Sequence, residues 1–438
     1  MGFFGRKRAP SVPHPRKEPR FDGPLTLERL EQIFQDCVDF TKRPVFLGEG
    51  GACTLTLCYL SGMVKMERVS DYVLRPLAQD EALARCGTPR QAMEEMMGGA
   101  LYNLSAAERT TLDEAAFDLV AGWCLLFFPG ESAVLSLFVG TEEKRSISSP
   151  SNETVLKGSR DAFVESLRTN TSIVRRHLKA PELRIREQVV GRQSVTSVDI
   201  LYIEGLTNPH LVEQVAAQLA DIDIDAVLAT GNIEEYIVPA ARTAFPLVQY
   251  TERSDRFCAG LAEGRVGILI DGLPLGYLAP GVLGDFLQAP QDKSESWLLA
   301  SALTLLRYLC MLGTLLLPAL YVAMVTFHQE MIPTRLALSI IAAKQDVPFR
   351  SVFEVIVLLL AFEILQEAGF RLPQSIGQTV SIIGGLVVGS AAVEAKIISP
   401  AVLIVVAIAG IAGYTMPSQD FAAALRLWRF GFAALAAL

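Results

Sequence analysis

Residues Trp297–Phe327 read WLLASALTLLRYLCMLGTLLLPALYVAMVTF, a run of 31 residues whose only charge is Arg307. A helix needs roughly 20 apolar residues to cross the hydrocarbon core of a bilayer, so this run is long enough to span on its own. Four shorter apolar runs follow it: Ser351–Gln366, Thr379–Val393, Ala401–Met416 and Phe421–Leu438. A buried soluble core explains one such run but hardly five in series. We therefore predict an all-α polytopic membrane domain over residues 297–438, with some of the shorter runs as re-entrant or half-membrane helices.

The unequal distribution of charge divides the chain into two parts. Only 15 of the 86 Lys, Arg, Asp and Glu residues lie in the 142 residues from Trp297 onward. The other 71 give the first 296 residues the charge density of an ordinary soluble protein. The N-terminus is basic and rich in proline, without the apolar segment of a signal peptide. We expect this soluble region to stay in the cytoplasm.

Four segments are predicted before the membrane domain. Residues 1–24 form a disordered basic leader, and 25–145 form a first α/β subdomain. A polar linker over 146–159 then leads to a second α/β subdomain over 160–290. In each subdomain, a strand is followed by helices and then by a hairpin with a Pro-Gly or Asp-Gly turn.

The two subdomains align with each other in two places. Tyr59–Met63 falls on Tyr202–Leu206 at an offset of 143, and Phe127–Gly130 falls on Leu269–Gly272 at an offset of 142. Two alignments that agree to one residue favour two subdomains of the same design. A different order of strands in the two sheets would refute this hypothesis.

The soluble region carries no recognisable catalytic, cofactor or metal motif. The seven cysteines of the whole chain include no CxxC pair, and its four histidines are isolated. The glycines at 48, 50 and 51 precede a predicted strand, and Cys53 stands where a dinucleotide fingerprint needs glycine. We predict no enzyme activity, no cofactor and no nucleic-acid partner. The polar stretch Phe245–Arg256, FPLVQYTERSDR, is either a loop that packs the following hairpin or a contact between subunits.

Charges within the apolar runs are the candidate functional residues, because each costs about 2.5–3.5 kcal/mol or more at the centre of a membrane helix. Arg307 lies ten residues into the first run, which places it near the midplane. Glu354 and Glu363 are nine residues apart, so they point to opposite faces of one helix. Glu394 stands near a predicted helix end. These residues either form buried ion pairs, with Arg307 bound to Glu354 or Glu363, or line a path for ions or water.

Small residues recur every four positions at Ser381, Gly385 and Gly389. Such a stripe lets two helices approach closely. A narrow pore lined by small residues has the same pattern, so both interpretations stay open.

The later part of the chain resembles the GerA family of spore germinant receptor A subunits, in which the stage V sporulation protein AF is a paralogue. The similarity runs from about Arg160 to the end and is carried by these consecutive motifs: FPLVQYTERSDR, EGRVGILIDGLPLGYLAP, LPALYVAMVTFHQEMIPTRLALSI, VPFRSVFEVIVLLLAFEILQEAGFRLPQSIGQTVSIIGGLVVGSAAVEAKIISP and VVAIAGIAGYTMP.

The resemblance implies a multi-pass protein of the spore inner membrane whose N-terminal region faces the cytoplasm. It implies a transporter-like B subunit and a lipoprotein C subunit as partners, a homo-oligomer, and a role in turning nutrient binding into ion release through a channel. An AF-type accessory channel or scaffold that amplifies germination is the alternative within the family. A secondary transporter and a recruiting scaffold are alternatives from other classes.

Overall fold

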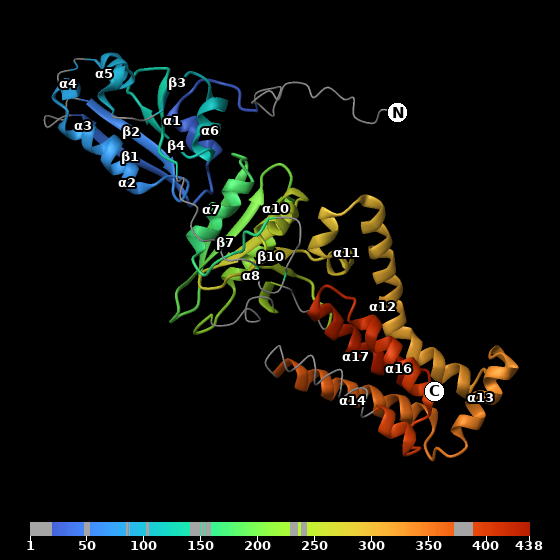
Figure 1. Cartoon of the computed structure of the whole chain (residues 1–438). Coiled ribbons are helices and arrows are strands. Elements are labelled where there is room, and N and C mark those ends of the chain that lie inside the picture. Colours follow the sequence, from blue (N-terminus) through green and yellow to red (C-terminus); the bar gives the residue numbers. More distant parts are fainter. Residues whose placement is uncertain are drawn as a thin grey trace, which may run out of the picture. The chain divides into compact units, whose positions relative to one another are not determined.

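A computed structural model describes residues 20–47, 53–84, 86, 88–101, 105–140, 150, 153, 159–227, 235–237, 243–371 and 389–438. The chain forms two compact units, one built mainly on residues before Pro280 and the other mainly on Pro280–Leu438. The first contains two five-stranded sheets and the second is helical (Figure 1). The predicted fold class is thereby confirmed.

The first sheet has helices on both faces. It consists of β1 (Phe40–Leu47), β2 (Cys53–Leu60), β3 (Ala106–Arg109), β4 (Trp123–Phe127) and β5 (Val134–Phe138), in the spatial order β1-β2-β4-β5-β3 with antiparallel neighbours. One face packs on α1 (Leu27–Ile33) and α6 (Leu112–Val120). The other packs on the segment with α2 (Met66–Arg68), η1 (Val69–Leu74), α3 (Arg75–Gln79), α4 (Glu81–Ala84), α5 (Pro89–Glu95) and η2 (Met96–Ala100). Because successive strand residues point to opposite faces, Leu57 joins the second core and Cys58 the first.

The second sheet repeats the order of the first. It consists of β6 (Leu183–Val190), β7 (Thr196–Ile203), β8 (Gln249–Thr251), β9 (Val266–Ile270) and β10 (Gly276–Ala279), in the order β6-β7-β9-β10-β8. Its helices are α7 (Leu167–His177), α8 (Pro209–Ala220) and α10 (Ser254–Ala262). Counted along the chain, both sheets have the order 1-2-4-5-3, so the hypothesis of two similar subdomains passes its test.

The aligned glycines take the same conformation in both subdomains. Gly62 and Gly205, each two residues after the end of its strand, have φ of 87° and 78°. Gly130 and Gly272, in the two hairpin turns, have φ of 81° and 82°. Only glycine adopts this left-handed region without steric cost. Both subdomains therefore need glycine at these two positions, because the backbone there has a positive φ.

A short piece of backbone joins the two subdomains. Asp36 and Val38, just before β1, exchange hydrogen bonds with Ile185 of β6: Val38 N donates to Ile185 O at 3.0 Å, and Ile185 N donates to Asp36 O at 3.2 Å. Asp36 has a φ of 61°, a region that aspartate tolerates better than most residues. Beside this contact, Arg175 of α7 binds Asp39 through two hydrogen bonds of 2.7 and 2.9 Å, with both side chains almost fully buried.

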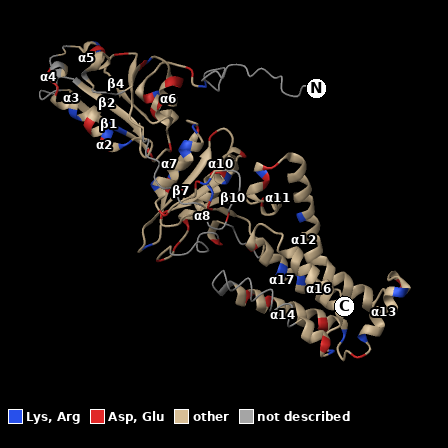
Figure 2. Ribbon diagram, in the orientation of Figure 1, with Lys and Arg blue, Asp and Glu red and all other residues tan. Residues whose placement is uncertain are grey.

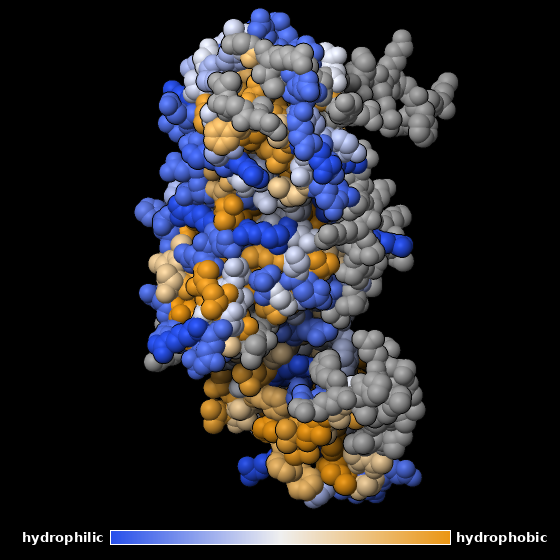
Figure 3. All heavy atoms as spheres, turned by 90° about the vertical axis from the view of Figure 1, so that its left-hand side faces the viewer, coloured by the Kyte–Doolittle hydropathy of each residue, from blue (hydrophilic) through white to orange (hydrophobic). Residues whose placement is uncertain are grey.

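The helical unit is built on four long helices. Its elements are α11 (Leu283–Leu287), η3 (Pro290–Ser294), α12 (Trp297–Thr326), η4 (Gln329–Met331), α13 (Thr334–Lys344), α14 (Ser351–Arg371), α16 (Pro400–Gly413) and α17 (Gln419–Leu435). Residues of α12, α14, α16 and α17 share one apolar core. Large apolar side chains also gather on the outside of this unit, as Figure 3 shows.

One described helix is long and apolar enough to cross a membrane, namely α12. The helix α16 is apolar but shorter. The structure thus supports one of the five predicted membrane segments by length and composition. The number of spans stays a prediction.

Asp199 on β7 is a buried acid. Its side chain is fully buried, and neither carboxylate oxygen has a hydrogen-bond partner among the described residues. Burial raises the pKa of Asp199 to about 7, although Arg168, 3.5 Å away, acts in the opposite direction. Glu187, its cross-strand neighbour on β6, contributes to the rise of this pKa.

We predict that Arg175→Met destabilises the protein strongly, because Asp39 then stays buried without a counter-charge. Breaking a buried pair in this way typically costs about 3–5 kcal/mol. Thermal unfolding of the detergent-solubilised protein measures the effect. Arg186→Met is the matched control, since Arg186 pairs with Asp36 at the same junction but is more exposed, and it should cost about 1 kcal/mol or less. Equal losses would contradict a special role for the buried pair.

We also predict a pH-dependent benefit of Asp199→Asn. An unfolded aspartate has a pKa of about 3.9, so the raised pKa in the folded state makes stability fall as the pH rises from about 4 to about 7. The Asp199→Asn variant does not lose stability in this way, because asparagine does not ionise. The free energy of unfolding of the variant, relative to that of the wild type, should therefore rise by about 2.6 kcal/mol between pH 5 and pH 8. A difference that does not change with pH would contradict the raised pKa.

Candidate functional site

Charged residues are sparse along the helical unit, as Figure 2 shows. Two of them, Glu354 and Arg429, are buried. Glu354, in the first turn of α14, is 1% exposed. Its Oε2 accepts a hydrogen bond of 2.8 Å from the backbone N–H of Ser399, the N-cap residue of α16. A carboxylate at this position satisfies a free amide and interacts favourably with the positive end of the helix dipole. Glu354 therefore stabilises the start of α16.

The other oxygen of Glu354 faces a group of polar side chains. Lys344 Nζ, at the end of α13, lies 3.6 Å from Glu354 Oε1 and binds the Ser351 hydroxyl. The hydroxyl of Tyr321 on α12 lies beside the Ser399 side chain. Glu354 Oε1, Ser399 Oγ and Tyr321 Oη are all buried. The two hydroxyls interact with each other, and Glu354 Oε1 accepts no hydrogen bond from a described residue. These five residues are called the Glu354 cluster below.

Glu363 belongs to a separate cluster on the opposite side of α14. Its Oε1 accepts from Arg429 Nη2 at 2.5 Å, and its Oε2 lies 3.6 Å from Arg426 Nε. Arg426 also binds Gln366, whose amide donates to the Tyr414 hydroxyl at 2.9 Å. The Glu363 cluster thus links α14 to α17 and to the end of α16. The described partners of Glu363 are thus different from those of Glu354.

Arg307 has a different partner from the predicted ones. It forms two hydrogen bonds with the carboxylate of Asp292 and donates to Leu287 O at 3.2 Å. The expected pairing with Glu354 or Glu363 is therefore wrong. The reason is that α11 and η3 fold back along the first turns of α12, which brings Asp292 beside a residue 15 positions later in the chain.

The remaining predicted residues have other surroundings. Glu394 is exposed at the end of a short helical segment, which corrects its interpretation as a buried ion pair. A side chain added at Gly389 would meet Leu403 Cδ1 at 2.9 Å, so this glycine allows close packing against α16. Ser381 and Gly385 lie outside the described residues.

Comparison with known proteins decides the family. The model of the Bacillus/Clostridium GerA spore germination protein matches residues 28–438. The chain belongs to the GerA family. Among relatives, the uncharacterized membrane protein YfkQ of Bacillus subtilis is 37% identical over 94% of this chain and 79% of its own length. Spore germination protein KA of the same species is 38% identical over 90% of this chain and 72% of its own.

A solved structure is also similar to part of the chain. The crystal structure of the N-terminal domain of the A subunit of the Bacillus megaterium spore germinant receptor GerK3 covers 59% of this chain and 94% of its own, with 27% identity and a TM-score of 0.48. The resemblance to the GerA family noted in the sequence is confirmed by the family model and the relatives.

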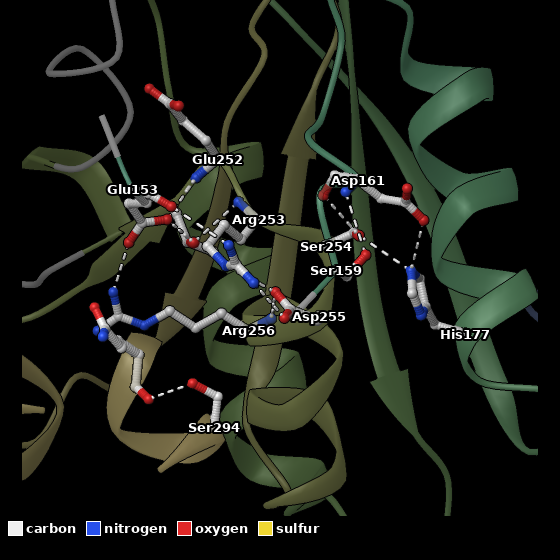
Figure 4. A network of polar contacts seen from close by, with 12 residues as sticks. Glu153, Ser159, Asp161, His177, Glu252, Arg253, Ser254, Asp255, Arg256 and Ser294 are labelled. Atoms are coloured by element: carbon white, nitrogen blue, oxygen red, sulfur yellow. Dashed lines mark hydrogen bonds and ion pairs between the residues drawn. The ribbon is translucent and has the colours of Figure 1, made fainter. Parts of the chain in front are cut away.

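In this GerA-family chain, the last residues of the stretch FPLVQYTERSDR, from Thr251 to Arg256, form a polar network in the second subdomain (Figure 4). Arg253 binds Asp255 through two hydrogen bonds of 3.0 and 2.6 Å and is 3% exposed. Arg256 Nη1 donates to Glu153 at 2.6 Å, and the backbone N–H of Glu252 donates to the same carboxylate at 3.2 Å. The stretch thus holds Glu153 of the predicted linker, and the burial of Arg253 favours the packing interpretation.

Ser254, His177 and Asp161 lie close together, as Figure 4 shows, but they do not form a catalytic triad. Ser254 Oγ lies 3.1 Å from His177 Nε2, and Asp161 Oδ2 lies 3.6 Å from the same nitrogen. A triad needs the acid on the other ring nitrogen, where it orients the base. Ser254 is also fully buried and donates to Asp161 O, so this contact is structural.

Sequence reasoning missed the partners of the two glutamates. Arg426 and Arg429 are three residues apart in the last apolar run, which places them on one face of a helix. Two arginines on one face of an apolar helix predict an acidic partner on another helix. Nothing in the sequence points to Tyr321 or Ser399, because their relation to Glu354 arises only when α12, α14 and α16 pack together.

We predict that Glu363→Gln destabilises the helical unit, because it leaves Arg429 buried without a full counter-charge. The expected loss is about 3 kcal/mol or more, read as a lower unfolding temperature in detergent. Asp346→Asn is the matched control, since Asp346 pairs with Lys396 at 2.6 Å on the exposed surface, and it should cost at most about 1 kcal/mol. A Glu363→Gln protein as stable as this control would show that the pair is dispensable.

Proposed function

We propose that this GerA-family protein is a membrane subunit of a spore germinant receptor, and that its helical unit forms an oligomeric ion channel that converts nutrient binding into ion release. The protein would lie in the spore inner membrane with its two α/β subdomains in the cytoplasm. It would act with a transporter-like B subunit and a lipoprotein C subunit, the partners that the family resemblance implies.

The buried Glu354 cluster is the observation that carries this proposal. A carboxylate at 1% exposure lies among apolar helices with one oxygen free of hydrogen bonds. An ionisable residue inside a membrane domain is costly and is therefore a candidate for an ion pathway. The large apolar side chains on the outside of the same unit support a lipid environment.

The coupling role follows from the two-part construction of the chain. A cytoplasmic region without a recognised catalytic motif is suited to binding other subunits rather than to chemistry. Its two subdomains are joined by the buried Arg175–Asp39 pair and by backbone hydrogen bonds to β6. Such a rigid junction lets a movement of one subdomain be passed to the other.

Ion flux in liposomes that contain the purified protein tests the proposal. We expect the wild type to conduct and Glu354→Gln to change the selectivity among small cations, because the substitution removes a negative charge from the pathway. Arg307→Gln should keep the wild-type selectivity, since Arg307 pairs with Asp292 and not with either glutamate.

Two outcomes would contradict the channel. One is the absence of flux both from the protein alone and from the protein combined with its B and C partners. The other is flux whose selectivity is the same in the wild type and in folded Glu354→Gln. Either result would favour a scaffold.

A further inference from the structure

We propose that Glu354 Oε1, Ser399 Oγ and Tyr321 Oη form a binding site for a small monovalent cation, and that the Lys344 ammonium group is a tethered competitor at the edge of this site. A role of this site in ion passage rests on the proposed function. The binding of a cation to the site can be tested without any measurement of flux.

The three oxygen atoms come from three helices and are buried together. Tyr321 is 6% exposed, and Glu354 and Ser399 are each 1% exposed. Leaving a buried polar atom without a hydrogen bond typically costs about 1–3 kcal/mol. The Tyr321 and Ser399 hydroxyls interact with each other, but Glu354 Oε1 accepts no hydrogen bond from a described residue. A buried carboxylate oxygen in this state beside two hydroxyls points to a bound ligand, because native cores keep few unsatisfied polar groups.

The donor atoms of the site indicate which ligand it would bind. A carboxylate and two hydroxyl oxygens are hard donors, which suit cations that bind oxygen. One negative charge is too little for calcium or magnesium, which usually take several carboxylates or phosphates. The described residues include no group of three acidic, histidine or cysteine side chains that could hold a metal. A monovalent ion matches the single charge.

Lys344 neutralises the negative charge of Glu354. Its Nζ lies 3.6 Å from Glu354 Oε1, which is an ion-pair distance but too long for a hydrogen bond. The side chain is 27% exposed, so its ammonium group reaches the carboxylate from the surface. None of the residues of α13 is buried, so little packing holds Lys344 in place. Withdrawal of this ammonium would leave the carboxylate free to bind a diffusible cation.

Thermal unfolding of the full chain in detergent tests the site, in potassium, sodium or choline chloride at equal concentration. Choline is a bulky quaternary ammonium ion, which oxygen ligands cannot coordinate at the short distances of potassium or sodium. We expect the wild type to unfold at similar temperatures in all three salts. Lys344→Gln should be stabilised by potassium or sodium relative to choline, by about 3 °C at a concentration near 100 times Kd.

Two further variants separate a site from a general salt effect. The double variant Lys344→Gln with Glu354→Gln should lose the difference between small and large cations. Lys396→Gln removes a lysine from the exposed pair with Asp346 and should show no difference either. A Lys344→Gln protein that does not distinguish the salts, or a Lys396→Gln protein that responds equally, would overturn the proposal.

Direct binding of radioactive rubidium to the wild type decides the question if Lys344→Gln does not fold. We expect weak, saturable binding that Ser399→Ala weakens further, since this substitution removes one ligand and keeps the backbone N–H that binds Glu354 Oε2. The absence of saturable binding would overturn the site. Binding without ion flux, both from the protein alone and from the protein combined with its B and C partners, would keep the site and reject the channel.

Discussion

The ion pair between Glu363 and Arg429 limits how the helices of the C-terminal unit can pack. Arg429 is 2% exposed in an apolar environment, where an unpaired charge costs several kcal/mol. The pair therefore sets the rotation of α14 against α17, because a turn of either helix about its axis would separate the charges. Glu354, on the other side of α14, then faces the start of α16. One ion pair thus positions both faces of the same helix.

The soluble unit depends on a comparable constraint at the junction of its subdomains. Each subdomain has its own sheet and core, so each can bury its apolar residues alone. What joins them is polar: the backbone hydrogen bonds of Ile185 and the buried pair of Arg175 with Asp39. Polar contacts of this kind are directional and therefore specify one arrangement. The junction therefore ties two subdomains of the same fold to each other through specific contacts.

The local elements were predictable from the sequence, and the contacts between distant elements were not. Strand alternation and the glycines at 62, 130, 205 and 272 identify the repeat, because turn conformation depends on a few neighbouring residues. The partner of Arg307 depends on the way η3 folds back along α12, which hydropathy does not encode. The opposite directions of Glu354 and Glu363 follow from helix geometry alone. Their partners on α13, α16 and α17 required the packed structure.

The two clusters of the helical unit are not equally suited to a cation. Around Glu363, two guanidinium groups face one carboxylate, so the local charge repels cations. Around Glu354, one ammonium faces one carboxylate, and the ammonium belongs to a side chain that reaches in from the surface. Moving Lys344 away turns the local charge from neutral to negative, whereas moving one arginine from Glu363 leaves that cluster neutral. A cation that passes through this unit would therefore pass along the face of α14 that carries Glu354, and the Glu363 cluster would hold the helices together beside it.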